Sequence, residues 1–373
     1  MLKLMTGMNL RDRGAAYWER SPKWKRVALA ISFIAFFYAL PFLNNPLINT
    51  PGSDFQSVLF YPVGMYVLMA IGLNIVVGKS GLLDLGYVAF FAIGAYTMAI
   101  LGTKTSLNFW EILPIGVGLA MLSGVLLGSP TLRLRGDYLA IVTLGFGEIV
   151  RIFAVNTDSI GGARGIAGVP TPPDLFKAKF TILDPKPYYW LLLTFTLLII
   201  WMVRRMAARR PGRAWDAIRQ DDDVAQLMGI NTRNIKLLAF AMGASFGGIA
   251  GAMFASFQGF VSPESFSLME SISVLAMVVL GGIGHIPGVV LGGVILSALP
   301  EVLRHVVEPL QKKIFGAVLI EAEVLRQLLY GLAMVLIMLN RPSGLWPAPK
   351  SEDRPDHDVD VDKPAHTSGI APV

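Results

Sequence analysis

Long stretches without a charged side chain are the feature of this sequence that most constrains its fold. The hydrocarbon core of a bilayer is about 30 Å thick and takes roughly 20 apolar residues of α-helix to cross, because every backbone amide inside it must be paired within its own segment. The windows that approach this length, one of them interrupted by a Glu and an Arg, are residues 27–43, 55–78, 85–103, 112–132, 138–155, 187–203, 237–257, 271–300 and 327–340. The window 271–300 is too long for one span and is broken at 281–288, so we interpret it as two short helices.

These windows predict an all-α, polytopic membrane helix bundle of about ten transmembrane helices with one Gly/Pro-broken pair. The composition agrees, since only 16% of the side chains are charged and the mean hydropathy is +0.57, against about 25% charged residues in soluble domains. The chain has no cysteine, and its four histidines lack the paired spacing of zinc ligands. We therefore expect neither a metal nor a bound cofactor.

The basic residues predict how the chain is oriented. Residues 1–26 contain seven lysines and arginines and residues 204–236 contain eight, so the positive-inside rule places both segments, and both termini, in the cytoplasm. This organisation gives a basic cytoplasmic N-terminus at 1–26, a transmembrane domain at 27–347 with a cytoplasmic loop at 204–236, and a disordered cytoplasmic tail at 348–373. The net charge of +6 is explained by orientation, so we expect no nucleic-acid partner.

Three ionisable residues lie within or at the edge of the apolar windows, where charges mark functional sites by default. Glu148 and Arg151 are three residues apart on one helical face, so they can neutralise each other or can act directly in transport. Asp84 follows Gly81 and can cap the helix that begins there.

Glycines recur at every fourth position of the window 237–257, at Gly243, Gly247 and Gly251. Such spacing strips one helix face to backbone and predicts close helix packing, while the alternative is a face along which a solute passes. The glycine-broken segment 281–288 is typical of the discontinuous helices of transporters.

The cytoplasmic loop contains a candidate docking helix. Pro211 can open this helix and Gly229 can close it, with Arg219 and Asp223 four residues apart as an ion pair. Trp215 and other apolar residues give the helix an apolar face outside the bilayer, which favours docking into a partner's groove. The alternative is an amphipathic helix that lies on the membrane surface.

A family resemblance begins at this loop. Asp223-Val224-Ala225, followed three residues later by Gly229, resembles the Glu-Ala-Ala-x-x-x-Gly loop of ABC importer permeases, with Asp for Glu and Val for the first Ala. More specific are the segments that resemble the branched-chain amino acid permease subunits of ABC importers: 72–86, 132–151, 212–219 (GRAWDAIR), 236–252 and 340–345 (NRPSGL). The resemblance covers roughly residues 55–347 and is to the second, longer permease of the pair, which has an extended basic N-terminus.

The resemblance implies an assembly in the bacterial inner membrane. In it, this chain pairs with a homologous second permease, two ATP-binding subunits and a periplasmic binding protein that delivers leucine, isoleucine or valine. It implies an ATPase-coupling loop formed by Gly212, Arg213, Asp216, Ile218, Arg219, Asp223, Ala225 and Gly229, with Arg213, Asp216, Arg219 and Asp223 as rim contacts and Ile218, Ala225 and Gly229 at the packed centre. For the translocation path we name Asn74, Asp84, Glu148, Arg151 and Gly282.

Several alternatives remain open at the level of the sequence. Gly78-Lys79-Ser80 resembles the end of a phosphate-binding loop but lacks the glycine five positions earlier, so ATP is expected on partner subunits and no enzymatic activity on this chain. Related permeases also carry urea, short amides or other amino acids. A proton-coupled secondary transporter with Glu148 as the carrier, and a purely structural membrane subunit, are the alternatives from other classes.

Overall fold

The computed structural model describes residues 23–42, 55–132, 137–174, 180–181, 184–315, 322–340 and 344–346, and most of them lie in helices. In chain order the helical elements are α2 (Lys23–Ala39), η2 (Leu40–Phe42), α3 (Phe55–Val58), η3 (Leu59–Gly64), α4 (Met65–Asn74), η4 (Ile75–Lys79), α5 (Val88–Lys104), α6 (Phe109–Thr131), α7 (Asp137–Asn156), η5 (Asp158–Ile160), η6 (Gly162–Arg164), α8 (Lys186–Ala207), α9 (Arg210–Gln220), α10 (Asp222–Leu227), α11 (Thr232–Gln258), η7 (Pro263–Phe266), α12 (Leu268–Gly281), α13 (Ile286–Phe315) and α14 (Ala322–Asn340). Two short strands, β1 (Ile166–Ala167) and β2 (Phe260–Val261), pair antiparallel. The prediction of a mainly helical bundle is confirmed.

Six stretches of helix in the described ranges are long and apolar enough to cross a membrane: Phe55–Lys79, Phe109–Thr131, Tyr138–Asn156, Lys186–Ala207, Thr232–Gln258 and Ile286–Leu303. Two further apolar helices are shorter, α5 with 17 residues and α12 with 14 residues. Helices α2 and α14 cover the remaining two predicted windows. The chain is thus a multi-pass membrane protein, and the predicted count of about ten spans remains a prediction.

The break predicted at 281–288 is present, but one of the two helices beside it is not short. Helix α12 ends at Gly281, and α13 begins at Ile286 and continues for 30 residues to Phe315, through Pro300 and the charged residues after it. The prediction was wrong here because it took the end of the uncharged stretch as the end of the helix. A helix that leaves the apolar region can continue with charged side chains once water is available to them.

Glycines allow three helices to touch backbone to backbone. A Cβ on Gly251 of α11 would lie 1.9 Å from the carbonyl oxygen of Phe91 on α5, and a Cβ on Gly94 would lie 2.2 Å from that of Gly248. A Cβ on Gly124 of α6 would lie 2.9 Å from the carbonyl oxygen of Phe240. These contacts agree with the interpretation of the glycine repeat as a close-packing face.

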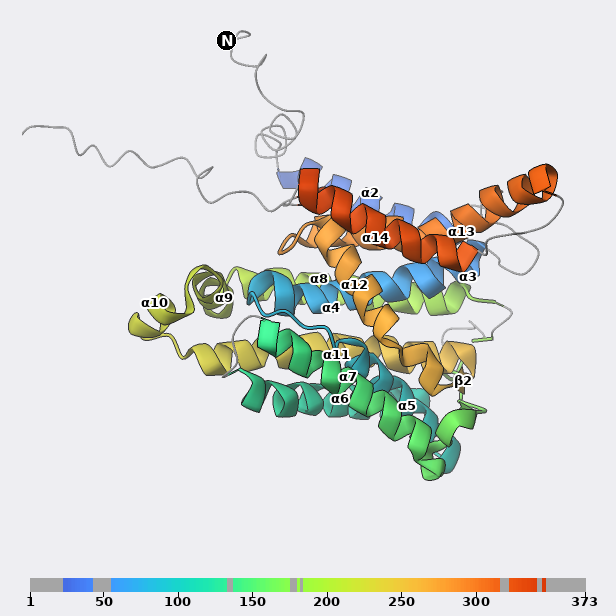
Figure 1. Ribbon diagram of the computed structural model, residues 1–373, viewed down its shortest axis with the longest axis horizontal. Helices are drawn as coiled ribbons and strands as arrows, with labels where there is room; N and C mark the ends of the chain where they lie inside the picture. The colour runs from blue at the N-terminus through green and yellow to red at the C-terminus, as the bar shows by residue number, and fades with distance from the viewer. Residues whose placement is uncertain are drawn as a thin grey trace, which may run out of the picture.

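The helices form layers (Figure 1). Helices α5, α6, α7 and α11 lie on one side of the bundle and α2, α13 and α14 on the other, with α4 and α8 between them. The helical run Phe55–Lys79 is interrupted at Tyr61, whose φ of −130° and ψ of 121° are extended, directly before Pro62. The end of the bundle that carries α9 and α10 lies opposite to the end that carries β2.

Several predictions concern residues outside the described ranges. These are most of the basic N-terminal segment, the tail 348–373, and residues 341–343 of the sequence motif 340–345. Orientation in the membrane also stays a prediction.

Candidate functional site

Helix α9 is held tightly against the rest of the chain. Pro211 stands in its first turn, and Gly212 approaches the end of α8 so closely that a Cβ would lie 2.1 Å from the carbonyl oxygen of Ala207. Trp215 is fully buried and its indole N–H donates a 2.8 Å hydrogen bond to the carbonyl oxygen of Ile235 on α11. The apolar face of α9 therefore packs inside its own chain.

The predicted single helix over 212–229 is two helices. Asp221 is extended, with φ of −157° and ψ of 116°, and its carboxylate accepts hydrogen bonds from the backbone N–H groups of Asp223 and Val224 at 2.9 and 3.0 Å. This is an N-cap, which satisfies donors that the first helical turn leaves open. Arg219 on α9 and Asp223 on α10 consequently do not share one continuous helix.

Helix α10 presents an apolar surface to the outside of the molecule. Val224, Leu227 and Met228 are 53%, 86% and 80% exposed. By contrast, Ile218 and Ala225, expected at the packed centre of a partner interface, are 5% and 3% exposed and are covered by the chain's own residues. The exposure of Val224 and Leu227 was not predicted from the sequence. The signal for them was their apolar character beside a run of three aspartates.

The remaining predicted loop residues line the outer side of this region. Arg213, Asp216 and Gly229 are exposed, and Gly229 has a φ of +83°, a conformation that favours glycine. Asp216 lies 3.8 Å from the ammonium group of Lys79, an exposed ion pair of small energetic value.

A buried lysine ties α10 to α11. The Lys236 ammonium lies 2.6 Å from a carboxylate oxygen of Asp222, and the lysine is only 8% exposed. Because an ammonium in such a position requires a partner, a shift of α10 must either carry α11 along or break this pair.

Arg219 links α9 to the end of the helical run Phe55–Lys79. One of its guanidinium N–H groups donates a 2.7 Å hydrogen bond to the carbonyl oxygen of Gly78. The same guanidinium nitrogen would lie 2.5 Å from a Cβ placed on Gly284, so it sits directly against the break between α12 and α13. The Arg219 side chain retains exposed surface, but it donates its hydrogen bond to the backbone of its own chain. The sequence resemblance implied instead that Arg219 contacts a partner at the rim of an interface.

Asn74 joins the helical run Phe55–Lys79 to the break between α12 and α13. Its side-chain oxygen accepts a 2.8 Å hydrogen bond from the backbone N–H of Gly284, and the residue is 1% exposed. A Cβ on Gly78 would lie 2.2 Å from that oxygen and 2.5 Å from the Gly284 nitrogen. Gly282, with a φ of +116°, belongs to the same break. We call Asn74, Gly78, Arg219, Gly282 and Gly284 the junction.

A C-terminal segment closes the other side of the break. The backbone N–H groups of Leu345 and Trp346 donate to the carbonyl oxygens of Leu280 and Gly281 at 2.8 and 3.1 Å. The His285 ring lies within hydrogen-bond distance, 3.0 Å, of the carbonyl oxygen of Trp346.

Asp84 is fully buried, but it does not cap α5. Its carboxylate accepts a 2.9 Å hydrogen bond from the backbone N–H of Gly86, two residues before the helix begins at Val88. Gly86 in turn is so close to α7 that a Cβ would lie 1.8 Å from the carbonyl oxygen of Thr143. Asp84 therefore shapes the turn that lets this connector touch α7.

Glu148 and Arg151 form the predicted pair on α7. The Arg151 Nε donates to the Glu148 carboxylate at 3.0 Å, and the two side chains are 37% and 32% exposed. The structural pairing is confirmed. None of the hydrogen bonds and ion pairs described for these residues joins this pair to the junction.

Sequence reasoning missed a small cavity beside α12. Tyr66 donates a hydrogen bond to the carboxylate of Glu270, and both residues line this cavity together with Tyr61, Met65, Met69, Phe91, Phe254 and Ser265. Its free volume of about 10 Å³ is close to what one water requires. The available signal was Glu270 itself, a carboxylate directly before the uncharged window 271–300.

Comparison with known proteins identifies relatives of this chain. The family model described as the permease component of branched-chain amino acid transport systems matches residues 57–338. The high-affinity branched-chain amino acid transport system permease protein LivM of Escherichia coli (strain K12) is 44% identical over 208 residues, which make up 50% of this chain and 49% of that protein. The chain thus aligns with about half the length of this relative.

Two further relatives extend the comparison. The probable branched-chain amino acid transport permease protein LivM of Methanocaldococcus jannaschii is 24% identical over 328 residues, 79% of this chain and 94% of that protein. The permease protein LivH of Salmonella typhimurium (strain LT2) is 26% identical over 207 residues, 50% of this chain and 65% of that protein. No solved structure matches the chain at a significant level. The family model spans most of the sequence, and six helices of this chain are long and apolar enough to cross a membrane. The chain therefore belongs to the permease components of branched-chain amino acid transport systems.

Proposed function

We propose that this chain is the membrane permease subunit of an ATP-driven ABC importer for leucine, isoleucine and valine. In this assembly it pairs with a related second permease, is driven by two cytoplasmic ATP-binding subunits, and receives its substrate from a periplasmic binding protein in a bacterial inner membrane. Family membership and the names of the relatives, LivM and LivH, support the proposal. ATP binds to the partner subunits in this proposal, and this chain supplies part of the path.

The exposed apolar surface of α10 is the observation that carries the proposal. Leu227 and Met228 are each at least 80% exposed, and α10 lies at one end of the bundle (Figure 1). Two such side chains on a capped helical turn between charged residues fit a groove on another protein better than they fit water. We assign this surface to docking of an ATP-binding subunit.

The contacts of α9 and α10 give the docked subunit a route into the membrane domain. A displacement of α10 is resisted by the Lys236–Asp222 pair on α11, and a displacement of α9 is resisted by the Arg219 hydrogen bond to Gly78. Only contacts that differ between two states can shift an equilibrium between them. The docked ATPases would therefore shift the equilibrium between two arrangements of the junction, where the helical run Phe55–Lys79 and helix α12 end.

The ion pair on α7 favours the importer over a proton-coupled transporter. Glu148 accepts hydrogen bonds from Arg151, so its negative charge has a fixed partner on the same helix face. Arg151 thus engages both carboxylate oxygens of Glu148, which gives this residue a structural role on its own helix. Of the remaining residues proposed for the path, Asp84 and Gly282 lie on connectors, and Asn74 is the last residue of α4.

The test is reconstitution of the full assembly in proteoliposomes, with the binding protein on one side and ATP on the other. We expect leucine, isoleucine and valine uptake that requires ATP and the binding protein, and no uptake of urea or short amides. Leu227→Asp and Met228→Asp should each abolish uptake and release the ATP-binding subunits on co-purification, because a carboxylate cannot be buried without a partner.

Ala163→Asp is the matched control, since Ala163 is exposed in η6 at the far end of the bundle. It should retain both uptake and ATPase co-purification. Concentrative uptake by this chain and the second permease without ATPases would refute the proposal, and so would normal ATPase binding by both α10 variants.

A further inference from the structure

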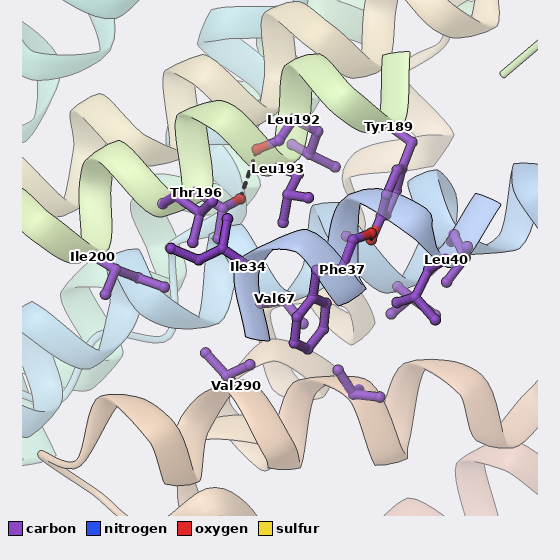
Figure 2. Close-up of a pocket in the computed structure, with 15 residues that line it drawn as sticks. Ile34, Phe37, Leu40, Val67, Tyr189, Leu192, Leu193, Thr196, Ile200 and Val290 are labelled. Atoms are coloured by element: carbon purple, nitrogen blue, oxygen red, sulfur yellow. Dashed lines mark hydrogen bonds between the residues drawn. The ribbon is translucent and has the colours of Figure 1, made fainter. Parts of the chain in front are cut away.

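An apolar groove lies between α2, η3, α4, α8 and α13, and the proposed transport function does not use it. Figure 2 shows Ile34 and Phe37 of α2, Leu193 of α8 and Val290 of α13 arranged around this groove. Its free volume is about 200 Å³, which exceeds the roughly 150 Å³ of an apolar cavity that stays dry and binds benzene. The groove is therefore large enough to hold part of a hydrocarbon chain.

The lining offers nothing to a zwitterionic amino acid. Its two side-chain hydroxyl groups are already engaged with backbone, since Thr196 donates to the carbonyl oxygen of Leu192 at 2.8 Å and Tyr189 donates to that of Phe37 at 3.0 Å. The other lining side chains are aliphatic or aromatic. An ammonium or carboxylate would lose its hydration here without compensation, so the occupant is apolar.

The helices that wall the groove face the hydrocarbon of the bilayer. Exposed apolar side chains flank it, with Ile31 and Phe36 on α2 and Leu198 and Trp201 on α8, each more than half exposed. Lipid acyl chains are the medium in contact with such surfaces within a membrane. An acyl chain can enter the groove sideways from the bilayer without crossing water.

At the end of the groove that Leu40 and Tyr189 line, hydrogen bonds join α2 to α8. The Trp190 indole donates to the carbonyl oxygen of Tyr38 at 3.1 Å, and the hydroxyl groups of Tyr38 and Thr194 are hydrogen-bonded at 2.7 Å. These contacts join the C-terminal end of α2 to the N-terminal part of α8, so the two helices run antiparallel. A chain that occupies the groove must extend toward the opposite end.

That opposite end is basic. Helix α8 carries Arg204 and Arg205 in its last turn, both exposed, and the Arg205 guanidinium lies 5.6 Å from the Trp201 ring centre. Leu193 and Arg204 are eleven residues apart, which is three helical turns and returns to the same face. The separation of about 16 Å along the helix matches half of a hydrocarbon core about 30 Å thick. A phospholipid with one chain in the groove would place its phosphate at these arginines.

We propose that this groove binds an anionic phospholipid of the leaflet on the side of Arg204, with an acyl chain between α2 and α8 and the headgroup on Arg204 and Arg205. The lipid fills the space between α2 and the rest of the bundle, and it fixes α2 in place.

The test uses the full-length chain, purified in detergent and delipidated, then titrated with dioleoyl phosphatidylglycerol or dioleoyl phosphatidylcholine. Native mass spectrometry counts bound lipid, and the melting temperature reports stabilisation. We expect phosphatidylglycerol to bind about tenfold or more tightly than phosphatidylcholine, from attraction to two arginines. Glycerol phosphate, which has the headgroup charge without chains, should give no stabilisation.

Two variants separate the chain site from the headgroup site. Val290→Phe fills the groove and should lower the affinity for both lipids about tenfold, whereas Ile295→Phe, exposed on the same helix outside the groove, should not. Arg204→Gln combined with Arg205→Gln should remove the preference for phosphatidylglycerol, whereas Arg164→Gln at the far end of the bundle should not.

Equal affinity for the two lipids in the unmodified chain, or unchanged lipid binding by Val290→Phe, would overturn the proposal. An Ile34→Cys variant that crosslinks to the second permease in membranes would also overturn it, because a protein would then cover the groove. These measurements do not involve transport, so they stand or fall independently of the proposed function.

Discussion

Replacing Arg219 by glutamine tests whether the loop acts on the membrane domain through the junction. Arg219 donates a 2.7 Å hydrogen bond from a charged group to the carbonyl oxygen of Gly78. Hydrogen bonds to charged groups contribute about 1.5–3 kcal/mol, and we take the lower value because the arginine retains exposed surface. A loss of about 1.5 kcal/mol lowers the coupling between loop and junction about tenfold.

The assay compares uptake with ATP hydrolysis in proteoliposomes of the full assembly. Arg219→Gln should leave ATP-binding subunits attached and ATP hydrolysis active, while the number of amino acids imported per ATP falls about tenfold. Gly284→Ala should reproduce this loss, since its Cβ would displace the same guanidinium nitrogen, 2.5 Å away, and would lie 3.0 Å from the carbonyl oxygen of Gly78 at a φ of +86°. Arg210→Gln is the control, because Arg210 is exposed on the same helix and loses the same charge.

Two results would refute this reasoning. If Arg219→Gln releases the ATP-binding subunits, Arg219 acts as a rim contact with the partner, as the sequence resemblance implies. If Arg219→Gln imports the normal number of amino acids per ATP, the hydrogen bond to Gly78 does not transmit the movement of α9.

Two further substitutions test the helix packing and the α7 ion pair. Gly251→Leu places side-chain atoms where the carbonyl oxygen of Phe91 lies and should destabilise the chain by about 3 kcal/mol. This is the upper end of the usual cost of overpacking, because the backbone of Phe91 cannot yield. Gly118→Leu, with open space around the glycine, should leave the melting temperature unchanged. Glu148→Gln leaves the Arg151 charge without this partner in a membrane span and should lower the fraction of the chain that inserts into membranes. Exchanging the two residues, Glu148→Arg with Arg151→Glu, should restore that fraction. Normal insertion with loss of uptake would instead mean that the pair acts in transport.

The spans were predictable because a single physical quantity decides them. The hydrocarbon core contains no water to hydrogen-bond the backbone, so a charge-free window of about 20 residues is expected to be a helix that pairs its own N–H and C=O groups. The end of α13 was not predictable by the same rule, because a helix that emerges into water meets no penalty at Glu301 and its neighbours. The start of α10 was within reach of the sequence, since Asp221 before two further acidic residues is a typical N-cap.

The junction was out of reach of sequence reasoning. Arg219 and Gly78 are 141 residues apart, and Asn74 and Gly284 are 210 residues apart. Helical periodicity places Arg219 on a face of α9, but it does not say whether that face meets a partner or the chain's own backbone. The glycines at 78 and 284 were visible as helix breaks, whereas their mutual contact depends on how distant helices pack.

The backbone contacts among α5, α6 and α11 have a mechanical consequence. Where carbonyl oxygens meet glycine Cα atoms, no side chain lies between the helices to change rotamer and absorb a sliding motion. These three helices must therefore rotate or translate as one rigid block. Whatever deformation accompanies solute passage must be concentrated at the joints around that block, at the interruption before Pro62 and at the break between α12 and α13.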